Sequence, residues 1–457
     1  MKRTLIILLA FAAAHVGKSA GQTPWTMQQC MQYAVKHNHE VRRTELELDN
    51  RKADKTAAIG NFLPSVGASV GAQYNFGRAI NPETNGYTDV STFYNGYSLY
   101  ASLPVFDGFS RIHALKAAGA SVLMGRQALR QKQDQTALNV MQAYTNVVYY
   151  EGLVKMADEK VQETELLLKQ IRLLEEVGRK SAADVAQVES QKAEADYELT
   201  RQQNRYASAM LELKKTMAFP MSDELRVKSE ECPFGLPSYH DERMAAANSS
   251  LLALHSSLQV ARYQVQVSKH EWRQARAALL PALSLSAGLN TTYYHTLHST
   301  GGASFGNQFK NNMGEYVGAT LSIPLFNRLQ TVTNIRKAKN NYRIAQETYM
   351  QKQIELEKLS REAWQDWQGY LKQTVQMVEK VEADSIAYQL TKRQFEEGLS
   401  TAIDLRTTSA QLLNSKATLL QCQLMTMVKE QLVRYYRGET IWSSERRAEF
   451  TPAIPSD

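Results

Sequence analysis

The sequence predicts an α+β chain made of two copies of one unit, in which long coiled-coil helices alternate with β-hairpins. Three observations predict this class: landmark motifs that recur at one offset, long proline-free stretches of helix-forming residues, and short segments in which apolar and polar residues alternate. Apolar residues make up 43% of the 457 residues, the ordinary content of a folded protein. A disordered chain is therefore not expected.

Three landmarks recur in the same order, which indicates internal duplication. They are a Leu-Pro dipeptide, a Pro-x-Phe joint and a Gly-x-x-Ser/Thr-x-x-Asp turn. The first copies begin at Leu63, Pro104 and Gly178, and the second copies begin at Leu280, Pro324 and Gly398, at offsets of 217 to 220 residues. This period is far too long for a solenoid repeat, so each half is itself a unit of several elements.

The N-terminus has the features of a secretory signal peptide. Lys2 and Arg3 give a basic start, residues 5–14 form an apolar stretch, and small residues follow at 19–21. We therefore expect a signal peptide at 1–21. No run of 18 apolar residues follows it, so we expect no transmembrane helix after the signal.

The landmarks divide the rest of the chain into repeats and connections. The predicted segments are a first repeat at 22–220, a linker at 221–240, a second repeat at 241–436 and a C-terminal tail at 437–457. Each repeat begins with a helix and ends with a long helical hairpin, whose turn lies near residue 178 or 398. Between them lies a β-hairpin, at 64–106 in the first repeat and 281–326 in the second.

The long helical hairpins are predicted from two stretches without proline, residues 105–219 and 325–451. Both are rich in helix-forming residues, and each is broken once, by a glycine followed by Ser or Thr, which is the pattern of a helix C-cap and a new N-cap. The first arms would span residues 108–176 and 327–396. At ~1.5 Å per residue such an arm is ~105 Å long, a length that indicates coiled-coil packing.

The apolar seams of the last helix predict a neighbour on each of two faces. Two adjacent stripes repeat every seven residues: Leu405, Leu412 and Leu419, then Leu413, Leu420 and Met427. Two stripes suit a helix in a ring, whereas a simple pair needs one. The lengths agree with a ring, because the return arm at 182–217 and the helix at 26–59 together match one long arm. An isolated antiparallel hairpin or bundle remains an alternative.

Four strands are predicted from strict alternation. The clearest apolar set is Val66, Ala68, Val70, Ala72, Tyr74 and Phe76, which alternates with Ser, Gly, Gln and Asn. Strands of this length, about 12 residues, suit a tilted membrane crossing. Tyr and Phe gather near the strand ends, and the loops at 81–86 and 298–312 are polar. A soluble sandwich would also alternate, but four strands in lipid leave open edges, so several chains would have to contribute.

The ordered set of motifs resembles the TolC-like outer-membrane efflux proteins, also called outer membrane factors. The carriers are Asn38-His39-Glu40, the Leu-Pro strand entries, the two Pro-x-Phe joints, Ala143-Tyr144-x-x-Val147 and the duplicated turns. The resemblance spans the chain from about Trp25 to Tyr436. It implies a trimeric α-helical barrel in the periplasm joined to a 12-stranded β-barrel in the outer membrane, with four strands per chain. Residues 218–240 and the tail would form an equatorial belt.

The resemblance also implies a function and partners. Such a protein is the outer-membrane exit duct of a tripartite efflux pump or a type I secretion system, and it passes drugs, small molecules or polypeptides to the exterior. Its partners would be a periplasmic adaptor (membrane fusion) protein, an inner-membrane transporter of RND, ABC or MFS type, and outer-membrane lipid. The alternative is a secreted or periplasmic coiled-coil protein that does not conduct. The net charge of +7 is a mild excess, which does not predict a nucleic-acid partner.

The resemblance places the candidate site at the helical turns. In the family an acidic pair at the second turn narrows the periplasmic entrance and selects cations. Asp404 stands at the first of these positions, but Thr407 stands at the second with Arg406 beside it, so this chain departs from the pattern. Asp404 also fits a plain capping role at a helix start, and that role is the expectation for Asp184. The adaptor would contact the turns, which contain Gly178, Asp184, Gly398 and Thr401.

No enzyme, cofactor or metal site is predicted. The segment His37-x-His39-Glu40 lacks the His-Glu-x-x-His spacing of a zinc site. Trp364 and Trp367 lie three apart on a helix, a spacing typical of packing residues. The three cysteines, Cys30, Cys232 and Cys422, are too widely spaced for a disulfide framework. Cys30 also lacks the apolar and small residues of a lipoprotein signal before it, so no lipid anchor is expected there.

Overall fold

The structure is a computed structural model that describes residues 24–80, 85–89, 91–228, 254–297 and 303–442. The predicted signal peptide at 1–21 and Cys232 lie outside the described residues. The chain falls into two compact units. Unit 1 comprises Met1–Glu45, Leu129–Ser256 and Ile354–Asp457, and unit 2 comprises Leu46–Ala128 and Ser257–Gln353. The long helices α4 and α9 contribute residues to both.

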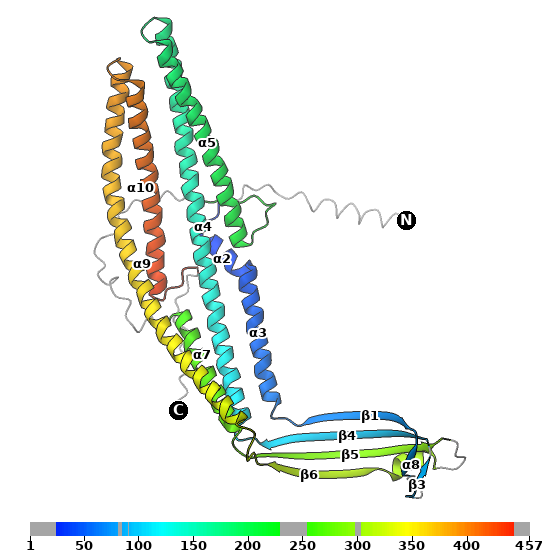
Figure 1. Cartoon of the computed structure of the whole chain (residues 1–457). Coiled ribbons are helices and arrows are strands. Elements are labelled where there is room, and N and C mark those ends of the chain that lie inside the picture. The colour runs from blue at the N-terminus through cyan, green and yellow to red at the C-terminus, as the bar shows by residue number, and fades with distance from the viewer. Residues whose placement is uncertain (1–23, 81–84, 90, 229–253, 298–302, 443–457) are drawn as a thin grey trace, which may run out of the picture. The chain divides into compact units, whose positions relative to one another are not determined.

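The β-sheet of unit 2 confirms the two predicted hairpins. Its strands in the described residues are β1 (Ser65–Asn75), β4 (Thr92–Phe106), β5 (Ala282–Thr296) and β6 (Gly314–Ser322). They form one antiparallel sheet in the order β1-β4-β5-β6 (Figure 1). The pairing of β4 with β5 joins the two repeats through backbone hydrogen bonds.

Two features at the far end of the sheet were not predicted. Short strands β2 (Arg78–Ile80) and β3 (Tyr87–Asp89) pair with each other. The loop expected at 298–312 contains a helix, α8 (Phe305–Asn311). The buried side chain of Gln308, a residue of α8, donates to the Tyr294 carbonyl and accepts from the Tyr294 N–H, both at 3.0 Å. The helix was not predicted within the polar loop, because one buried amide ties this segment to β5.

The same glycine and tyrosine pair occurs in both hairpins. Gly67 lies opposite Tyr100, and Gly288 lies opposite Tyr316. A Cβ atom on either glycine would come within 2.6 Å of a tyrosine ring atom. Each ring therefore covers a position where only glycine fits, a known way of fixing strand register. The duplication thus extends to the packing on the sheet.

The sheet exposes apolar side chains and two edges. Val66, Val70 and Val317 are 68%, 70% and 87% exposed. Within the described chain, β1 and β6 each have a strand on one side only. Unpaired strand edges are not tolerated in lipid, and large apolar faces are rarely left to water. The sheet is therefore incomplete in a single chain.

Aromatic rings gather at one end of the strands, as predicted. The Tyr74 ring lies 4.9 Å from the Phe93 ring and 6.3 Å from the Phe76 ring, measured between centroids. Phe93 lies 6.4 Å from Tyr293, which contacts α8 through Phe305. Such a cluster is typical of the interfacial girdle of an outer-membrane sheet.

Both joints between strand and helix are built in the same way. Phe109 and Leu329 have left-handed backbone, with φ of 70° and 64°. The Asp107 or Asn327 side chain accepts a hydrogen bond from the backbone N–H four residues later, at 3.0 and 3.3 Å. The Pro-x-Phe-Asp/Asn motif is therefore a turn with a built-in helix cap. Helix α7 (Ser256–Ala277) lies before the second hairpin, as α3 (His39–Gly60) does before the first.

Unit 1 contains most of the two helical hairpins and a short helix. The first hairpin pairs α4 (Ser110–Glu176) with α5 (Ala182–Met217), and the second pairs α9 (Gln330–Glu396) with α10 (Ala402–Tyr436), side by side in Figure 1. These ends agree with the predicted arms to within three residues. At ~1.5 Å per residue, α4 and α9 are each ~100 Å long.

The first predicted helix, at 26–59, is two helices, α2 (Met27–His37) and α3 (His39–Gly60). Asn38 breaks them because its backbone is extended, with ψ of 130°. Its side chain accepts from the Glu40 N–H at 2.8 Å and donates to the Thr216 carbonyl at 3.0 Å. The Asn38 amide caps α3 and also bonds to α5. These two hydrogen bonds make the broken helix more stable here than a continuous one.

A buried core in unit 1 collects residues distant in the sequence. Its centre includes Cys30, Met141 and Met217, all at most 3% exposed. Trp25 forms a β-bridge with Val227, which brings residues 218–228 back to the start of the chain. Ile441 and Trp442 pack on the same core. Residues 229–240 and 443–457 of the predicted belt segments lie outside the described part.

The free thiols of Cys30 and Cys422 are both buried. Burial raises the pKa of the Cys30 thiol to about 12, so it stays protonated and unreactive at neutral pH. Across the residues that the structure describes, we find no helix long and apolar enough to cross a membrane.

Tyr144 holds the start of the chain to the segment after α5. Its hydroxyl donates to the Lys228 carbonyl at 2.6 Å and lies 3.2 Å from the Trp25 carbonyl. Tyr144→Phe should lower the free energy of unfolding by about 1 kcal/mol, because it removes the hydrogen bond to the Lys228 carbonyl.

Denaturant unfolding followed by tryptophan fluorescence measures this loss. The matched control is Tyr197→Phe, since Tyr197 is 65% exposed; its effect should stay within about 0.5 kcal/mol. Equal midpoints for the two variants would contradict the assignment.

Candidate functional site at the hairpin turns

Both turns reverse the chain through a glycine with left-handed backbone. Gly178 has φ of 74° and Gly398 has φ of 79°. At each turn the N–H after the glycine donates to the carbonyl five residues earlier, at 2.8 Å for Arg179 and 2.7 Å for Leu399. This pattern closes the last turn of α4 and α9 and satisfies carbonyls that would otherwise lack partners.

Each following helix begins with a capping box. The Thr401 hydroxyl accepts from the Asp404 N–H at 3.2 Å, and the Asp404 carboxylate accepts from the Thr401 N–H at 3.1 Å. Ser181 and Asp184 repeat this arrangement at 3.2 and 3.0 Å. The predicted site residues therefore form two equivalent structures, and both acids have the capping role that was the alternative for Asp404.

Both carboxylates are fixed negative charges. Hydrogen bonds from the Thr401 hydroxyl, the Thr401 N–H and the Ser400 hydroxyl lower the pKa of Asp404 below its usual value. The pKa of Asp184 is lowered by the Ser181 N–H and hydroxyl. Each acid is therefore ionised at neutral pH, next to the positive end of its helix dipole.

The second turn exposes charged and polar side chains at the start of α10. Asp404, Arg406 and Thr407 are all exposed. The Thr407 hydroxyl donates to the Ile403 carbonyl at 2.9 Å, so it serves its own helix. A ring of Asp404 carboxylates needs several copies of the chain, so the pore role of Asp404 stays a prediction.

A small core packs the two turns together, which the sequence did not reveal. Phe395 is fully buried among Leu167, Ile171, Val188 and Leu405. Polar contacts cross the same boundary. The Lys180 ammonium lies 4.3 Å from the Phe395 ring centroid. The Gln191 amide donates to the Ala402 carbonyl at 3.2 Å.

A polar link joins the hairpins further from the turns. The Tyr388 hydroxyl of α9 donates to the Glu163 carboxylate of α4. Lys392 lies 3.6 Å from the same carboxylate, and Lys160 lies 2.9 Å from it. Glu163 thus balances two ammonium groups and one hydroxyl from both hairpins. The partners lie 225 residues apart, and no sequence motif marks them.

A second carboxylate ties α9 to α10. Asp384 accepts from Ser415 of α10 and from Lys380 at 2.9 Å. These two groups, Ser415 first, lower the pKa of Asp384. The Thr374 and Thr426 hydroxyls also contact each other at 3.1 Å. The second hairpin is therefore held by short polar side chains as well as by apolar packing.

The remaining candidates have structural roles. His37 stacks on Tyr33 at 4.1 Å between ring centroids. Trp364 and Trp367 lie 5.2 Å apart and pack against Val433, as predicted. Within the part of the chain that is described, no group of three or more His, Cys, Asp or Glu side chains is placed to hold a metal ion.

Comparison with known proteins identifies one family across both repeats. The sequence model described as "Outer membrane efflux protein" matches residues 30–218 and 247–434. The two matched segments correspond to the two repeats, and together they cover most of the chain.

Curated relatives match at low identity. The outer membrane efflux protein BepC of Brucella suis is 24% identical over 291 residues, 63% of this chain and 58% of BepC. The probable efflux pump outer membrane protein TtgC of Pseudomonas putida is 22% identical over 422 residues, 88% of this chain and 81% of TtgC. The outer membrane protein TolC of Escherichia coli is 25% identical over 360 residues, 75% of this chain and 67% of TolC.

Solved structures share the fold. CusC superposes with a TM-score of 0.76 at 16% identity, covering 90% of this chain and 92% of CusC. The outer membrane protein VceC from Vibrio cholerae gives 0.75 at 14% identity, covering 90% of this chain and 96% of VceC. The outer-membrane channel OprN gives 0.74 at 17% identity, with 91% of each chain covered. The expected fold class, a helical barrel joined to a β-barrel, is confirmed at this level.

The turn glycine can be tested by adding one methyl group. Gly398→Ala should destabilise the second hairpin by about 1–2 kcal/mol, because the left-handed backbone penalises a Cβ. No atom lies within 4 Å of the added Cβ, so strain and not a clash causes the loss.

The control is Gly369→Ala, in the interior of α9, where the Cβ also meets nothing within 4 Å. That change should stabilise by about 0.5–1 kcal/mol. Amide hydrogen exchange near the turn measures both effects, and a stabilising Gly398→Ala would refute the assignment.

Proposed function

Since this chain belongs to the outer membrane efflux protein family, we propose that three copies of it form the exit duct of an efflux pump or a type I secretion system. The protein is located in the outer membrane, with its helices extending into the periplasm. The proposal concerns the number of copies, the cargo and the partners.

The open sheet is the observation that carries the proposal. Four described strands per chain leave β1 and β6 as edges, and their apolar side chains are exposed. Pairing β1 of one copy with β6 of the next satisfies both edges and closes a ring. Three copies supply twelve strands, an even number within the range found in outer-membrane barrels. The half-buried stripes of α10, which include Leu412 and Leu419, support the same ring of helices.

The names of relatives indicate two kinds of cargo. One relative is an antibiotic efflux pump outer membrane protein, and another is an alkaline protease secretion protein. We propose that this chain likewise receives either small molecules or polypeptides from an inner-membrane transporter. A periplasmic adaptor would contact the turns that contain Gly178, Asp184, Gly398 and Thr401. The chain needs no cofactor for this role and would catalyse no reaction.

Conductance and mass test the proposal directly. The protein, extracted in detergent, is measured by native mass spectrometry and in a planar bilayer. A trimer that conducts steadily supports the duct. A monomer without conductance would refute it and favour a coiled-coil protein that does not conduct.

The charge of Asp404 is expected to act on permeating ions. In a trimer three ionised carboxylates would surround the axis at the second turn, and such a ring attracts cations. Asp404→Asn keeps a capping side chain but removes the charge, so cation over anion selectivity should fall severalfold.

Reversal potentials under a salt gradient measure the selectivity. Asp184→Asn is the matched control at the first turn and should leave it unchanged. If both variants behave like the wild type, Asp404 is only a helix cap.

The Glu163 link is expected to hold the hairpins together. Glu163→Ala removes the acceptor of Tyr388 and the charge opposite Lys392, so the hairpins should separate more readily and the conductance should rise at least twofold. The matched control is Glu165→Ala. Glu165 is on the same helix and pairs with Lys169 at 2.9 Å within it.

Single-channel recordings compare the three proteins. An unchanged conductance for Glu163→Ala, with normal trimer mass, would show that this link does not limit opening.

A further inference from the structure

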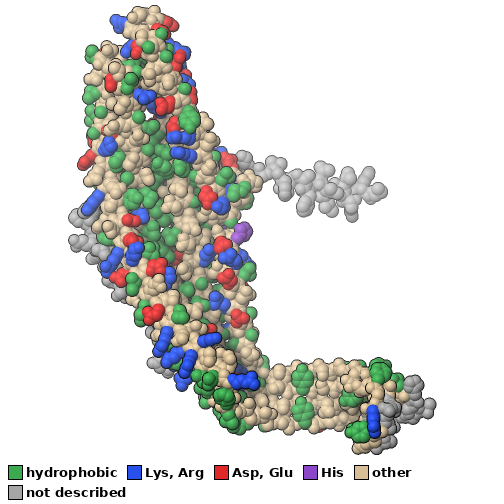
Figure 2. Space-filling model, viewed as in Figure 1, with side chains coloured by type: hydrophobic (Ala, Val, Ile, Leu, Met, Phe, Trp, Pro, Cys, Tyr) green, Lys and Arg blue, Asp and Glu red, His purple; other side chains and the backbone are tan. Residues whose placement is uncertain are grey.

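Positive charge is concentrated on the segments of unit 2 that flank the strands. Residues 46–64, 107–128, 257–281 and 323–353 together contain 16 Lys and Arg against 6 Asp and Glu, although the whole chain has a net charge of +7. The densest part is the start of α9, where residues 323–346 contain five cations and no acid. Figure 2 shows Lys and Arg side chains gathered on these helices next to the strands.

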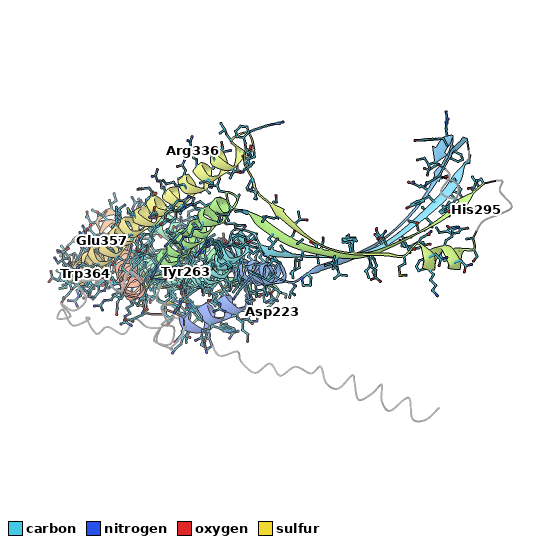
Figure 3. All side chains as sticks on the ribbon, turned by 90° about the horizontal axis from the view of Figure 1, so that it is seen from below. Asp223, Tyr263, His295, Arg336, Glu357 and Trp364 are labelled. Carbon is cyan, nitrogen blue, oxygen red and sulfur yellow. The ribbon has the colours of Figure 1, made fainter. Side chains whose placement is uncertain are left out.

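Six residues define what we name the basic band: Arg273, Arg276, Arg336, Lys337, Lys339 and Arg343. Arg336, Lys339 and Arg343 follow a spacing of three and four, so they share one face of α9. All six side chains are at exposed positions, and Arg336 lies at the margin of α9 (Figure 3).

The cations of the basic band lack carboxylate partners. Elsewhere the helices pair such groups within one turn, as Lys155 with Glu151 at 3.0 Å and Lys358 with Glu362 at 3.2 Å. Among the described residues, no ion pair joins Arg336, Lys337 or Arg343 to an acid. Exposed like charges that repel one another are usually kept where an anionic partner neutralises them.

Trp272 connects the two helices of the basic band. Its ring lies 5.7 Å from the Arg276 guanidinium and 5.9 Å from the Lys339 ammonium. It also stacks on Tyr342, with centroids 5.8 Å apart and planes at 10°. In the described structure the indole N–H is buried without a hydrogen-bond partner. Trp and Tyr beside Lys and Arg are the residues that anchor proteins at the level of lipid headgroups.

Two histidines near Arg273 of the basic band lie in the same positively charged surroundings. The rings of His113 and His270 lie 5.8 Å apart. Burial first, and then the charges of His113, Arg273, Lys116 and Lys269, together lower the pKa of His270 to about 4. Neutral histidines add no charge here at neutral pH, so the field comes from the Lys and Arg side chains.

The band lies within reach of a membrane surface. Strand β6 ends at Ser322 and α9 begins at Gln330. Arg343 is 13 residues along α9, or ~20 Å at ~1.5 Å per residue, and Arg336 is closer at ~9 Å. Headgroup layers are roughly 5–8 Å thick beyond the hydrocarbon, and charges act over a Debye length of about 8 Å. A strand end at the hydrocarbon boundary therefore brings the part of the band nearest the strands, Arg336 to Lys339, within reach of the phosphates.

We propose that the basic band binds the anionic phosphate headgroups of phospholipids in the periplasmic leaflet of the outer membrane. The charge, the exposed Arg and Lys and the Trp272 anchor match that surface, whereas a protein partner would need complementary apolar contacts. Bound lipid neutralises the repulsion along α9 and fixes the depth of the sheet in the membrane. The proposal depends on the outer-membrane location and not on conduction.

The test measures lipid bound to the full protein in detergent. The protein is stripped of lipid and titrated with phosphatidylglycerol or phosphatidylcholine in mixed micelles, and bound lipid per chain is counted by native mass spectrometry. A third titration uses inorganic phosphate. The midpoint of thermal unfolding is recorded in all three titrations. The band variant carries four changes: Arg336→Gln, Lys337→Gln, Lys339→Gln and Arg343→Gln.

The control variant removes the same charge from exposed cations of unit 1. Its four changes are Lys155→Gln, Lys169→Gln, Lys358→Gln and Arg361→Gln, at side chains 61%, 66%, 68% and 80% exposed. Wild type and control should bind phosphatidylglycerol more tightly than phosphatidylcholine. The ratio of the two affinities should be lower in the band variant by about tenfold or more. The lipid response should also vanish at ~1 M salt, where the Debye length is ~3 Å.

Three results would overturn the proposal. They are equal binding of the two lipids by the wild type, an unchanged preference in the band variant, and a thermal shift that inorganic phosphate reproduces in full. If the band variant does not assemble, the salt titration of the wild type decides alone, since a preference that survives ~1 M salt is not electrostatic.

Discussion

Every backbone N–H and C=O of a strand in lipid needs a partner, and this requirement governs the rest of the molecule. The described sheet satisfies it inside one chain for β4 and β5 but leaves one side of β1 and of β6 open. Closure therefore requires other copies of the chain. The helices that follow the strands are then brought into a ring, which accounts for α10 having two apolar stripes instead of one.

Duplication provides the symmetry that closure needs. The two hairpins pair with each other through β4 and β5, and each uses the same tyrosine over glycine contact. The joints repeat as well, with Asp107 and Asn327 in equivalent capping positions. One gene duplication thus supplies two nearly equal sectors per copy. The differences between them, such as Asp404 with Arg406 at one turn, are where the function of this chain can diverge from that of its relatives.

Charge is divided along the chain according to what each part contacts. The helices of unit 1 pair many of their Lys and Arg with acids three or four residues away, which adds a small stabilisation to a long helix. The helical segments of unit 2 next to the strands contain many more cations than acids. Each turn instead carries a negative charge in its capping box, the carboxylate of Asp184 or Asp404. These carboxylates stay ionised because the hydrogen bonds of the capping boxes lower their pKa.

Sequence patterns determined the parts of this fold that depend on nearby residues. The ends of α5 at Ala182 and Met217 agree with the predicted arm, because a glycine C-cap, a capping box and the absence of proline are local signals. The strand predicted from alternation at 64–76 was also correct, since alternation is a local signal. The break at Asn38 and the helix α8 were missed, since each is stabilised by a side chain reaching a distant carbonyl, Thr216 from Asn38 and Tyr294 from Gln308.

The family and the location were also accessible from the sequence, because the order of duplicated motifs is itself a sequence property. Only the tertiary structure decided which side chains meet between the hairpins, such as Glu163 with Tyr388 across 225 residues. The phase of a helix drifts by ~20° per heptad relative to an ideal seam. Over 67 residues that drift moves a side chain from one face to another, so contacts between two such helices follow from their supercoil and not from spacing along the chain.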